Sequence, residues 1–235
     1  MQPTYLPWLG YFDLIDQADC FVFLDSVQFS RRSWQQRNRI KSKDGEMRLT
    51  VPVISKGVRD QSIAQVEIDQ ATEFHRKHLR SIDHSYAKAP YYRDYFNELE
   101  AVLGKAHDHL AELNIELIGW MCDKMGITAK MVRSSTFGVE GNKVNLLVGI
   151  CQEIGAGNYL SPLGSMGYIE DNDIFASNGI ELRYQDYHHP QYSQLHGQFL
   201  ANMSALDLLM NEGPSSLEII RAGRGVKNRH EQQDN

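Results

Sequence analysis

The sequence has few cysteines and no long apolar run. Its three cysteines, Cys20, Cys122 and Cys151, are widely spaced and lie in apolar surroundings. Scattered cysteines in an odd number do not build a disulfide scaffold, so we expect reduced thiols in the core of a cytoplasmic protein. A helix that crosses a bilayer needs about 20 apolar residues, and the sequence shows neither such a run nor a signal peptide. We therefore expect no transmembrane segment.

A large surplus of one charge is also missing. The chain has 24 Lys and Arg against 30 Asp and Glu, which gives a formal net charge of -6. This balance argues against broad nucleic-acid binding, although it is compatible with one local basic patch. The Walker A, Gly-x-Gly-x-x-Gly and Gly-x-Ser-x-Gly motifs are absent. We therefore predict no serine nucleophile, and the cofactor stays unknown. The oligomeric state stays open.

The fold class is predicted from the order of apolar patterns. From residue 128 onward, the chain alternates predicted strands and helices, in the order 128–132, 142–154, 158–160, 171–177 and 180–184. This alternation is typical of an α/β protein with a mostly parallel sheet and helical crossovers. The length of 235 residues suits one large domain or two small ones. We predict a single α/β domain over residues 1–223 and a disordered tail over 224–235.

The middle of the chain adds a different kind of element. Asp44-Gly45 is a strong hairpin-turn signal, and apolar residues alternate over 48–54 and again over 62–68. We therefore expect a small antiparallel excursion near residues 38–68. Helical spacing then predicts helices over 71–85 and 97–125, the second being the longest in the chain. His75 and His78 have a spacing compatible with metal binding, but no third ligand is evident, so we predict no metal site.

The first 39 residues are the most distinctive part of the sequence. A loop rich in proline, glycine and aromatics precedes a buried strand over 20–24, and arginines around a tryptophan follow it. Arginine suits phosphate and carboxylate because its fork donates two parallel hydrogen bonds. We interpret this stretch as a binding site for an anionic small molecule. The residues predicted to bind substrate here are Gln2, Tyr5, Trp8, Tyr11, Gln28, Arg32, Trp34, Arg37 and Arg39.

Two later segments are predicted to complete the site. Ser161 follows a predicted strand, where α/β proteins tend to bind ligands. The segment 186–197 contains His188, His189, Tyr192 and Gln194, and histidine can act as an acid or base near neutral pH. We name Asp25, His188 and His189 as candidate catalytic groups. Each of these features also has a plain structural explanation: a solvated basic face, a packed loop, or histidines that cap and pack.

Several blocks together resemble the WbqC-like family. They are QPTYLPWLGYF at 2–12, ADCFVFLDSVQFSRRSWQQRNRI at 18–40, LTVPV at 49–53, YAKAPYY at 86–92, YLSPLGSMGYI at 159–169, and the closing YHHPQYSQ and MSALDLLMNEGP. The resemblance implies a place in bacterial O-antigen and related polysaccharide clusters, and a role as a glycine transferase that acylates an amino sugar. It also implies a short apolar strand ahead of Gln2. Here Met1 stands directly before Gln2, and we expect the natural chain to start further upstream.

The sequence thus supports a leading hypothesis and two alternatives. The leading one is a transferase that moves glycine or a similar aminoacyl group, from an unidentified donor, to a nucleotide-linked amino sugar. One alternative is a non-catalytic binding or assembly module, whose aromatics would form an interface. The other is an ATP-dependent nucleotidylyl- or adenylate-forming enzyme, because the loop, helix and strand of residues 2–24 are loosely similar to such proteins. However, Pro7–Tyr11 has no histidine where those enzymes carry His-x-Gly-His.

Overall fold

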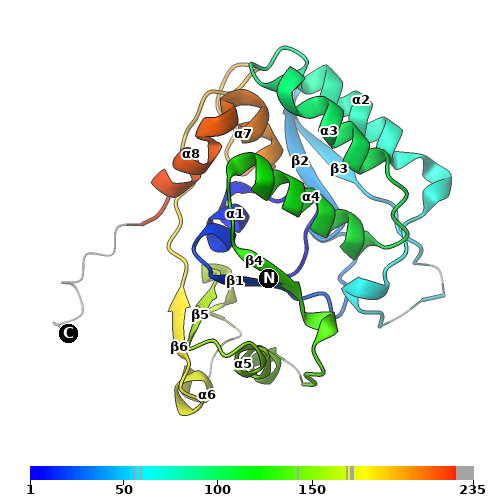
Figure 1. Cartoon of the computed structure of the whole chain (residues 1–235). Coiled ribbons are helices and arrows are strands. Elements are labelled where there is room, and N and C mark those ends of the chain that lie inside the picture. Colours follow the sequence, from blue (N-terminus) through cyan, green and yellow to red (C-terminus); the bar gives the residue numbers. More distant parts are fainter. Residues whose placement is uncertain (56, 59, 142, 168, 170–171, 226–235) are drawn as a thin grey trace.

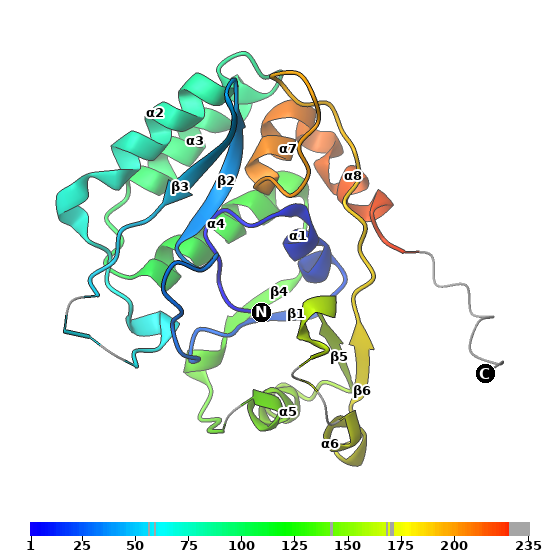
Figure 2. The same ribbon diagram turned by 180° about the vertical axis from the view of Figure 1, so that it is seen from behind.

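In the part of the chain that the structure describes, helices surround three small sheets in an α/β arrangement (Figures 1 and 2). This computed structural model describes residues 1–55, 57–58, 60–141, 143–167, 169 and 172–225. Each sheet has two strands. The predicted fold class is confirmed, although the sheets are smaller than the single, mostly parallel sheet that the alternating pattern suggested.

Two of the sheets are parallel pairs. Strand β1 (Cys20–Phe23) lies beside β4 (Lys130–Arg133), and β5 (Asn158–Ser161) lies beside β6 (Glu181–Tyr184). Parallel strands need a crossover, and α6 (Asn172–Ser177) connects β5 to β6 while α5 (Lys143–Glu153) precedes β5. The predicted alternation of strands and helices after residue 128 is therefore confirmed; Asp171, the expected first residue of the second helix, lies outside the described residues.

The predicted antiparallel excursion is confirmed, as a hairpin in its first half and as an isolated antiparallel bridge in its second. Strands β2 (Arg37–Ser42) and β3 (Gly45–Thr50) form a hairpin, and Gly45 has a φ of 100° at its turn. The strand predicted to continue to residue 54 ends at Thr50, since Pro52 has no amide to donate to a ladder. Residues 62–68 do not form a regular strand, but Ile68 pairs antiparallel with Val53, and the Ile54 amide donates to the Glu67 carbonyl at 2.9 Å. Ile63–Gln65 is a 3-10 turn, which begins with a capping box between Ser62 and Gln65.

The helices differ from the prediction mainly at one break. We predicted one helix over residues 97–125. The structure has two helices there, the end of α3 (Tyr92–Gly104) and the whole of α4 (Leu110–Met125). Gly104 has weak helix propensity, and His107 in the break binds Glu116 at 2.7 Å and the Lys105 carbonyl at 3.0 Å. The remaining helices are α1 (Leu9–Asp16), α2 (Phe74–Tyr86), α7 (Ala205–Glu212) and α8 (Ser216–Ala222).

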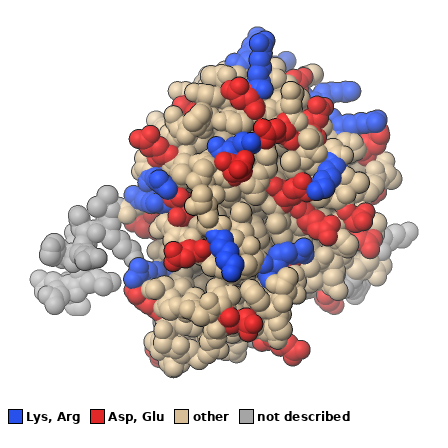
Figure 3. All heavy atoms as spheres, viewed as in Figure 1, with Lys and Arg blue, Asp and Glu red and all other residues tan. Residues whose placement is uncertain are grey.

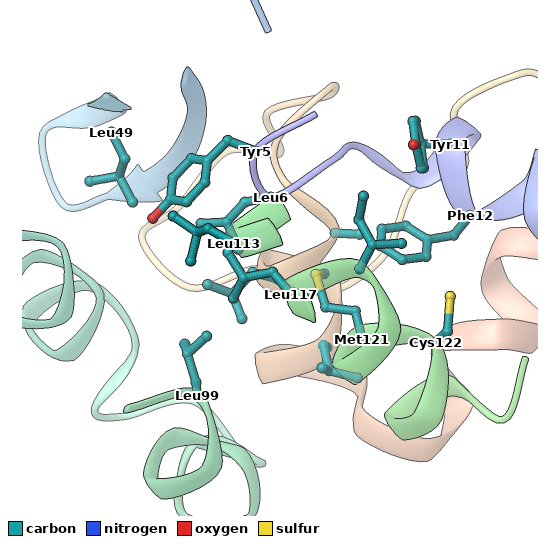
Figure 4. Packing of buried hydrophobic residues seen from close by; sticks show 14 of the residues in the cluster. Tyr5, Leu6, Tyr11, Phe12, Leu49, Leu99, Leu113, Leu117, Met121 and Cys122 are labelled. Carbon is teal, nitrogen blue, oxygen red and sulfur yellow. The ribbon is translucent and has the colours of Figure 1, made fainter. Parts of the chain in front are cut away.

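The main core lies between the first loop and α4. Figure 4 shows the Tyr5 ring directed toward Leu49, Leu6 near Leu113 of α4, and Phe12 of α1 packed near Met121. Tyr5 and Leu6 are fully buried, so the irregular first loop is an integral part of the core. Full burial of one large apolar side chain contributes about 1.5–3 kcal/mol, which fixes the path of this loop. A second, smaller cluster centres on Phe175 and packs β5 and β6 against α5 and α6.

The last described residues are anchored to the first helix. Arg224 donates from Nε to the buried carboxylate of Asp13 at 2.6 Å and also pairs with Asp16, while Arg221 binds Asp16 at 2.8 Å. We predicted a tail from residue 224, but Arg224 is bound in this way, and the Gly225 amide donates to the Asp186 carbonyl. Residues 226–235 lie outside the described residues.

The surface shows no single dominant charge on the face drawn in Figure 3, where basic and acidic side chains are interspersed. This pattern fits the formal net charge of -6. Among the described residues, no helix has both the length and the apolar character needed to span a bilayer.

Candidate functional site between Trp8 and Trp34

Two loops are tied together to form the site. The first precedes α1 and the second, residues 30–36, precedes β2. The Tyr5 amide donates to the Trp34 carbonyl at 3.1 Å, and the Gln35 side chain donates to the Gln2 side chain at 2.9 Å. Buried Asn114 of α4 donates to the carbonyls of Pro3 and Gln35, at 3.2 and 2.7 Å. These bonds satisfy carbonyls that no regular secondary structure would satisfy.

The first loop also contains a strained residue. Leu6 has a φ of 43°, in the left-handed region that bulky side chains rarely adopt. Its carbonyl accepts a 2.8 Å hydrogen bond from the side chain of buried Asn38, which also donates to the Tyr5 carbonyl at 3.0 Å. Such strain costs about 1–3 kcal/mol and persists only where the surroundings enforce it, often at binding sites.

The pocket between these loops has a volume of about 240 Å³. Two tryptophans, two asparagines and one arginine contribute to its lining, which consists of Met1, Thr4, Trp8, Tyr11, Trp34, Asn38, Arg39 and Asn202. Trp8 is fixed by its neighbours: its ring packs over Gly10, where an added Cβ would approach ring carbons to 2.4 Å. Trp34 is 49% exposed, which is unusual for so large an apolar ring and makes it accessible to a ligand.

Arg39 supplies the positive charge of the pocket. Its guanidinium carbon lies 5.1 Å from the centre of the Trp34 ring, a cation–π arrangement, and its Nη1 binds Glu46 at 2.8 Å. The Arg39 Nε is buried and has no hydrogen-bond partner. A buried donor of this kind costs free energy until an acceptor reaches it. The pocket therefore offers an unused donor next to two aromatic walls.

The other arginines of the predicted cluster lie elsewhere. Arg31 donates to the backbone carbonyls of Ser55 and Val58, and Arg32 is exposed, with a φ of 59°. Arg37 is half-buried on β2 but does not line the pocket. The predicted grip by several guanidiniums is thus reduced to the single side chain of Arg39. Arg37 shares its face of β2 with Arg39 but lies two residues earlier on the strand, and Arg32 lies in the loop before it.

Asp25 is placed as a structural anchor. It is fully buried where β1 and β4 end, and it accepts hydrogen bonds from Arg133 Nε at 2.6 Å, from the Ser135 amide and hydroxyl at 2.9 and 2.8 Å, and from the Ser134 hydroxyl at 3.2 Å. A carboxylate with four donors has no lone pair left for a substrate proton. The arrangement therefore does not favour Asp25 as a catalytic base.

His189 is the better placed of the two candidate histidines. Its ring stacks on Trp8 at 6.2 Å, and its Nδ1 lies 2.9 Å from the Pro190 carbonyl, which fixes the proton on Nδ1 and leaves a lone pair on Nε2. Burial lowers the pKa of His189, so the ring is neutral near pH 7. Nε2 is buried and unpartnered. His188, in contrast, is 80% exposed beside Asp186 and points into solvent.

The remaining predicted residues are divided between pocket, core and surface. Tyr11 lines the pocket, and its hydroxyl donates to the Gln2 carbonyl at 3.0 Å. Tyr5 is a core residue whose hydroxyl bonds to His78 at 2.8 Å, and Ser161 is a buried residue bonded to Ser165 at 2.5 Å. Three further side chains bind other parts of the protein: Gln28 binds Asp60, Tyr192 binds Asp207, and Gln194 binds the Leu200 backbone.

Sequence analysis missed Asn38, Asn114 and Asn202. A single sequence does not show which asparagines will donate hydrogen bonds to loop carbonyls. Asn38 does lie inside one of the blocks that resemble the WbqC-like family. Over the described part of the chain, no group of three His, Cys, Asp or Glu side chains could hold a metal ion. His78, one of the two histidines whose spacing is compatible with metal binding, is buried, and its ring bonds to the Tyr5 hydroxyl.

The fold and the site together define an α/β protein with a small aromatic pocket that contains one guanidinium. Comparison with known proteins makes this more specific. The chain belongs to the WbqC-like protein family, whose model matches residues 2–219. It is also 33% identical over 223 residues to an uncharacterized protein of Mycobacterium tuberculosis, a match that covers 94% of this chain and 96% of the relative. No solved structure matches the chain.

Proposed function

We propose that this protein is a transferase of surface polysaccharide (O-antigen) biosynthesis, which moves a glycyl or similar aminoacyl group to the amine of a nucleotide-linked amino sugar. The observation that carries the proposal is the unpartnered, buried Nε of Arg39, in a pocket that Trp8 and Trp34 also line. Aromatic faces stack on sugar and base rings, while a guanidinium binds phosphate oxygens. One compact site thus offers contacts to both parts of a sugar nucleotide.

The size of the pocket restricts what it can enclose. Ligand pockets usually measure about 300–1,000 Å³, and this one has a volume of about 240 Å³. It therefore has room for one ring, and we propose that the rest of the sugar nucleotide lies across the exposed face of Trp34. The diphosphate would then pass the guanidinium of Arg39, whose positive charge is only partly balanced by Glu46.

The proposed reaction needs no covalent bond between the protein and the substrate. The sugar amine forms a bond to the acyl carbon of an activated aminoacyl donor, the donor's leaving group departs with its electron pair, and one amine proton is removed. Positioning of the two reactants supplies much of the rate. Among the candidate bases named from the sequence, His189 is the one with a free lone pair, because Asp25 is saturated and His188 is in solvent.

The binding-module alternative finds less support at this place. A docking surface for another protein would be broad and flat, whereas Trp8 and Trp34 line a pocket of about 240 Å³ together with the polar side chain of Asn38. The adenylate-forming alternative would need several phosphate-binding cations in one place, and the described structure brings only Arg39 to the pocket.

Calorimetric titration with UDP- and dTDP-linked amino sugars tests the proposal. We expect Arg39→Gln to weaken binding at least tenfold, since it removes the charge and the free donor of the pocket. Arg32→Gln is the matched control, because this exposed arginine lies outside the pocket lining. Equal affinities for the wild type, Arg39→Gln and Arg32→Gln would overturn the proposed site. If none of the tested sugar nucleotides bound the wild type, the proposed substrate class would be overturned.

A further inference from the structure

The start of α7 is bonded to two segments that line the aromatic pocket. The Ala205 amide donates to the carbonyl of Pro7 in the first loop at 2.7 Å. The Ser204 amide donates to the Arg39 carbonyl of β2 at 2.8 Å. Two residues after Ala205, the side chain of Asp207 is fully buried. A buried carboxylate costs free energy unless it is hydrogen-bonded or paired, so its partners show what it organises.

Each oxygen of Asp207 accepts a hydrogen bond from one tyrosine. The Tyr86 hydroxyl donates to Oδ1 and the Tyr192 hydroxyl donates to Oδ2, both at 2.8 Å. Gln194 in turn donates to the Tyr192 hydroxyl at 3.1 Å. Burial raises the pKa of Asp207, while its hydrogen-bond donors and the positive charge of Lys41 act in the opposite direction. Hydrogen bonds to a charged acceptor are the stronger kind, so they fix both tyrosine hydroxyls in place.

The ring of Tyr192 packs against His189. The two rings stack with their centres 6.2 Å apart and their planes at 28°, and the ring of Phe199 contacts both. His189 also stacks with Trp8, at 6.2 Å and 17°, and Trp8 lines the pocket. An unbroken series of contacts therefore leads from the buried carboxylate of Asp207 through two rings to a wall of the pocket.

The imidazole of His189 has little else to hold it. Its Nδ1 lies 2.9 Å from the Pro190 carbonyl, and its Nε2 is buried without a partner. The ring torsion of histidine is intrinsically broad, so one hydrogen bond does not fix the direction of the other nitrogen. The rings of Tyr192 and Trp8 supply that constraint. Aromatic faces also stabilise a cation, which the imidazole becomes once Nε2 accepts a proton.

We propose that Asp207 and Tyr192 are positioning residues for His189, the candidate base. The carboxylate fixes the Tyr192 hydroxyl, and the Tyr192 ring fixes the plane of the imidazole. The lone pair of Nε2 then keeps one direction, and the proton that leaves the substrate amine forms its new bond there. Asp207 itself exchanges no proton. This inference rests on the proposed function for the reaction, but the orientation of His189 can be measured without a substrate.

Two phenylalanine variants of the full chain separate positioning from stability. Tyr192→Phe and Tyr86→Phe each delete one donor to the same carboxylate, but only the Tyr192 ring stacks with His189. Both melting temperatures should fall, because each variant weakens the pairing of a buried charge.

Diethylpyrocarbonate, which acylates a free imidazole nitrogen, reports on Nε2, and mass spectrometry locates the modified histidine. We expect His189 to react at least about tenfold faster in Tyr192→Phe and within about twofold of the wild-type rate in Tyr86→Phe. Exposed His188 reacts in every variant and is the internal reference.

Nitrogen NMR of the His189 ring gives a second readout, which overall destabilisation does not move. The wild type and Tyr86→Phe should show the single form protonated on Nδ1, and Tyr192→Phe should show a mixture of tautomers. Asp207→Asn weakens both hydroxyl contacts and should reproduce the result of Tyr192→Phe, which keeps the test open if that variant does not fold.

The outcomes distinguish this inference from the proposed function. Equal reaction rates and equal spectra in Tyr192→Phe and Tyr86→Phe would overturn the positioning role, even in a protein that binds UDP-linked amino sugars. A selective effect of Tyr192→Phe would support the positioning role. The same effect in a protein that binds none of the tested sugar nucleotides would support it and overturn the proposed substrate class.

Discussion

The side chain of Asn38 holds the carbonyl of Leu6 at 2.8 Å, and so one buried amide keeps a strained residue of the first loop in place. The same asparagine lines the aromatic pocket. The stability of the loop and the shape of the pocket thus depend on one group.

Asn38→Ala should therefore affect both properties. Loss of the two hydrogen bonds leaves the carbonyls of Tyr5 and Leu6 unsatisfied, so we expect the free energy of unfolding to fall by about 1–3 kcal/mol. Affinity for a sugar nucleotide should fall as the loop relaxes. Urea denaturation and calorimetry measure the two effects, and Asn97→Ala, at an exposed position of α3, is the control. A variant with normal stability and affinity would show that Leu6 is held by packing alone.

Trp34→Ala separates binding from folding. The ring is 49% exposed, so its removal should change the melting temperature by less than about 2 °C. Loss of its stacking face should weaken sugar-nucleotide binding about tenfold, equivalent to about 1.4 kcal/mol. Leu163→Ala is a matched control, because Leu163 is an equally exposed apolar residue away from the pocket. If the two variants bound equally well, the exposed ring would have no part in recognition.

Asp25→Asn tests whether this residue anchors or catalyses. An asparagine cannot accept all four hydrogen bonds and leaves Arg133 without its counter-charge, so we expect a loss of about 3 kcal/mol in unfolding free energy. Turnover measured well below the melting temperature should be nearly unchanged. The opposite result, full stability with lost turnover, would restore Asp25 as the base.

His78 makes stability depend on pH. Burial lowers its pKa from 6.5 to about 4, so between these values the unfolded chain binds a proton that the folded chain does not. Stability should therefore fall as the pH falls from about 6.5 to about 4, by up to about 3 kcal/mol from this group. His78→Gln, which can still accept from the Tyr5 hydroxyl, should flatten the slope of unfolding free energy over this range. An unchanged slope would assign the pH dependence to other groups.

The sequence predicted elements well where one local pattern dominated. The apolar run at 20–24 and the alternation after residue 128 are confirmed, since buried strands and their crossovers depend on short-range periodicity. It was less accurate over 62–68, where Ile63–Gln65 is a 3-10 turn and antiparallel pairing is limited to a bridge between Ile68 and Val53. The break between α3 and α4 depends on contacts of His107 with a distant turn of α4, which no local pattern shows.

The candidate site was predicted in outline and not in detail. Trp8, Trp34 and Arg39 do meet, because the first loop and the strand after the arginines are neighbours in space. Which arginine enters the pocket depends on its position along β2 and on the path of the loop at Arg32, and neither can be read from composition. Tyr5 was predicted to contact substrate, yet it packs against His78 because the loop turns its ring into the core.

The pairing of Arg224 with Asp13 has a consequence for synthesis on the ribosome. These partners are 211 positions apart, and Asp13 is a fully buried carboxylate. Until Arg224 leaves the exit tunnel, α1 presents this acidic group without its counter-charge. At about 5–20 residues per second, translation delays that pairing by tens of seconds. The first helix of the nascent polypeptide therefore cannot reach its final environment until residue 224 has been synthesised.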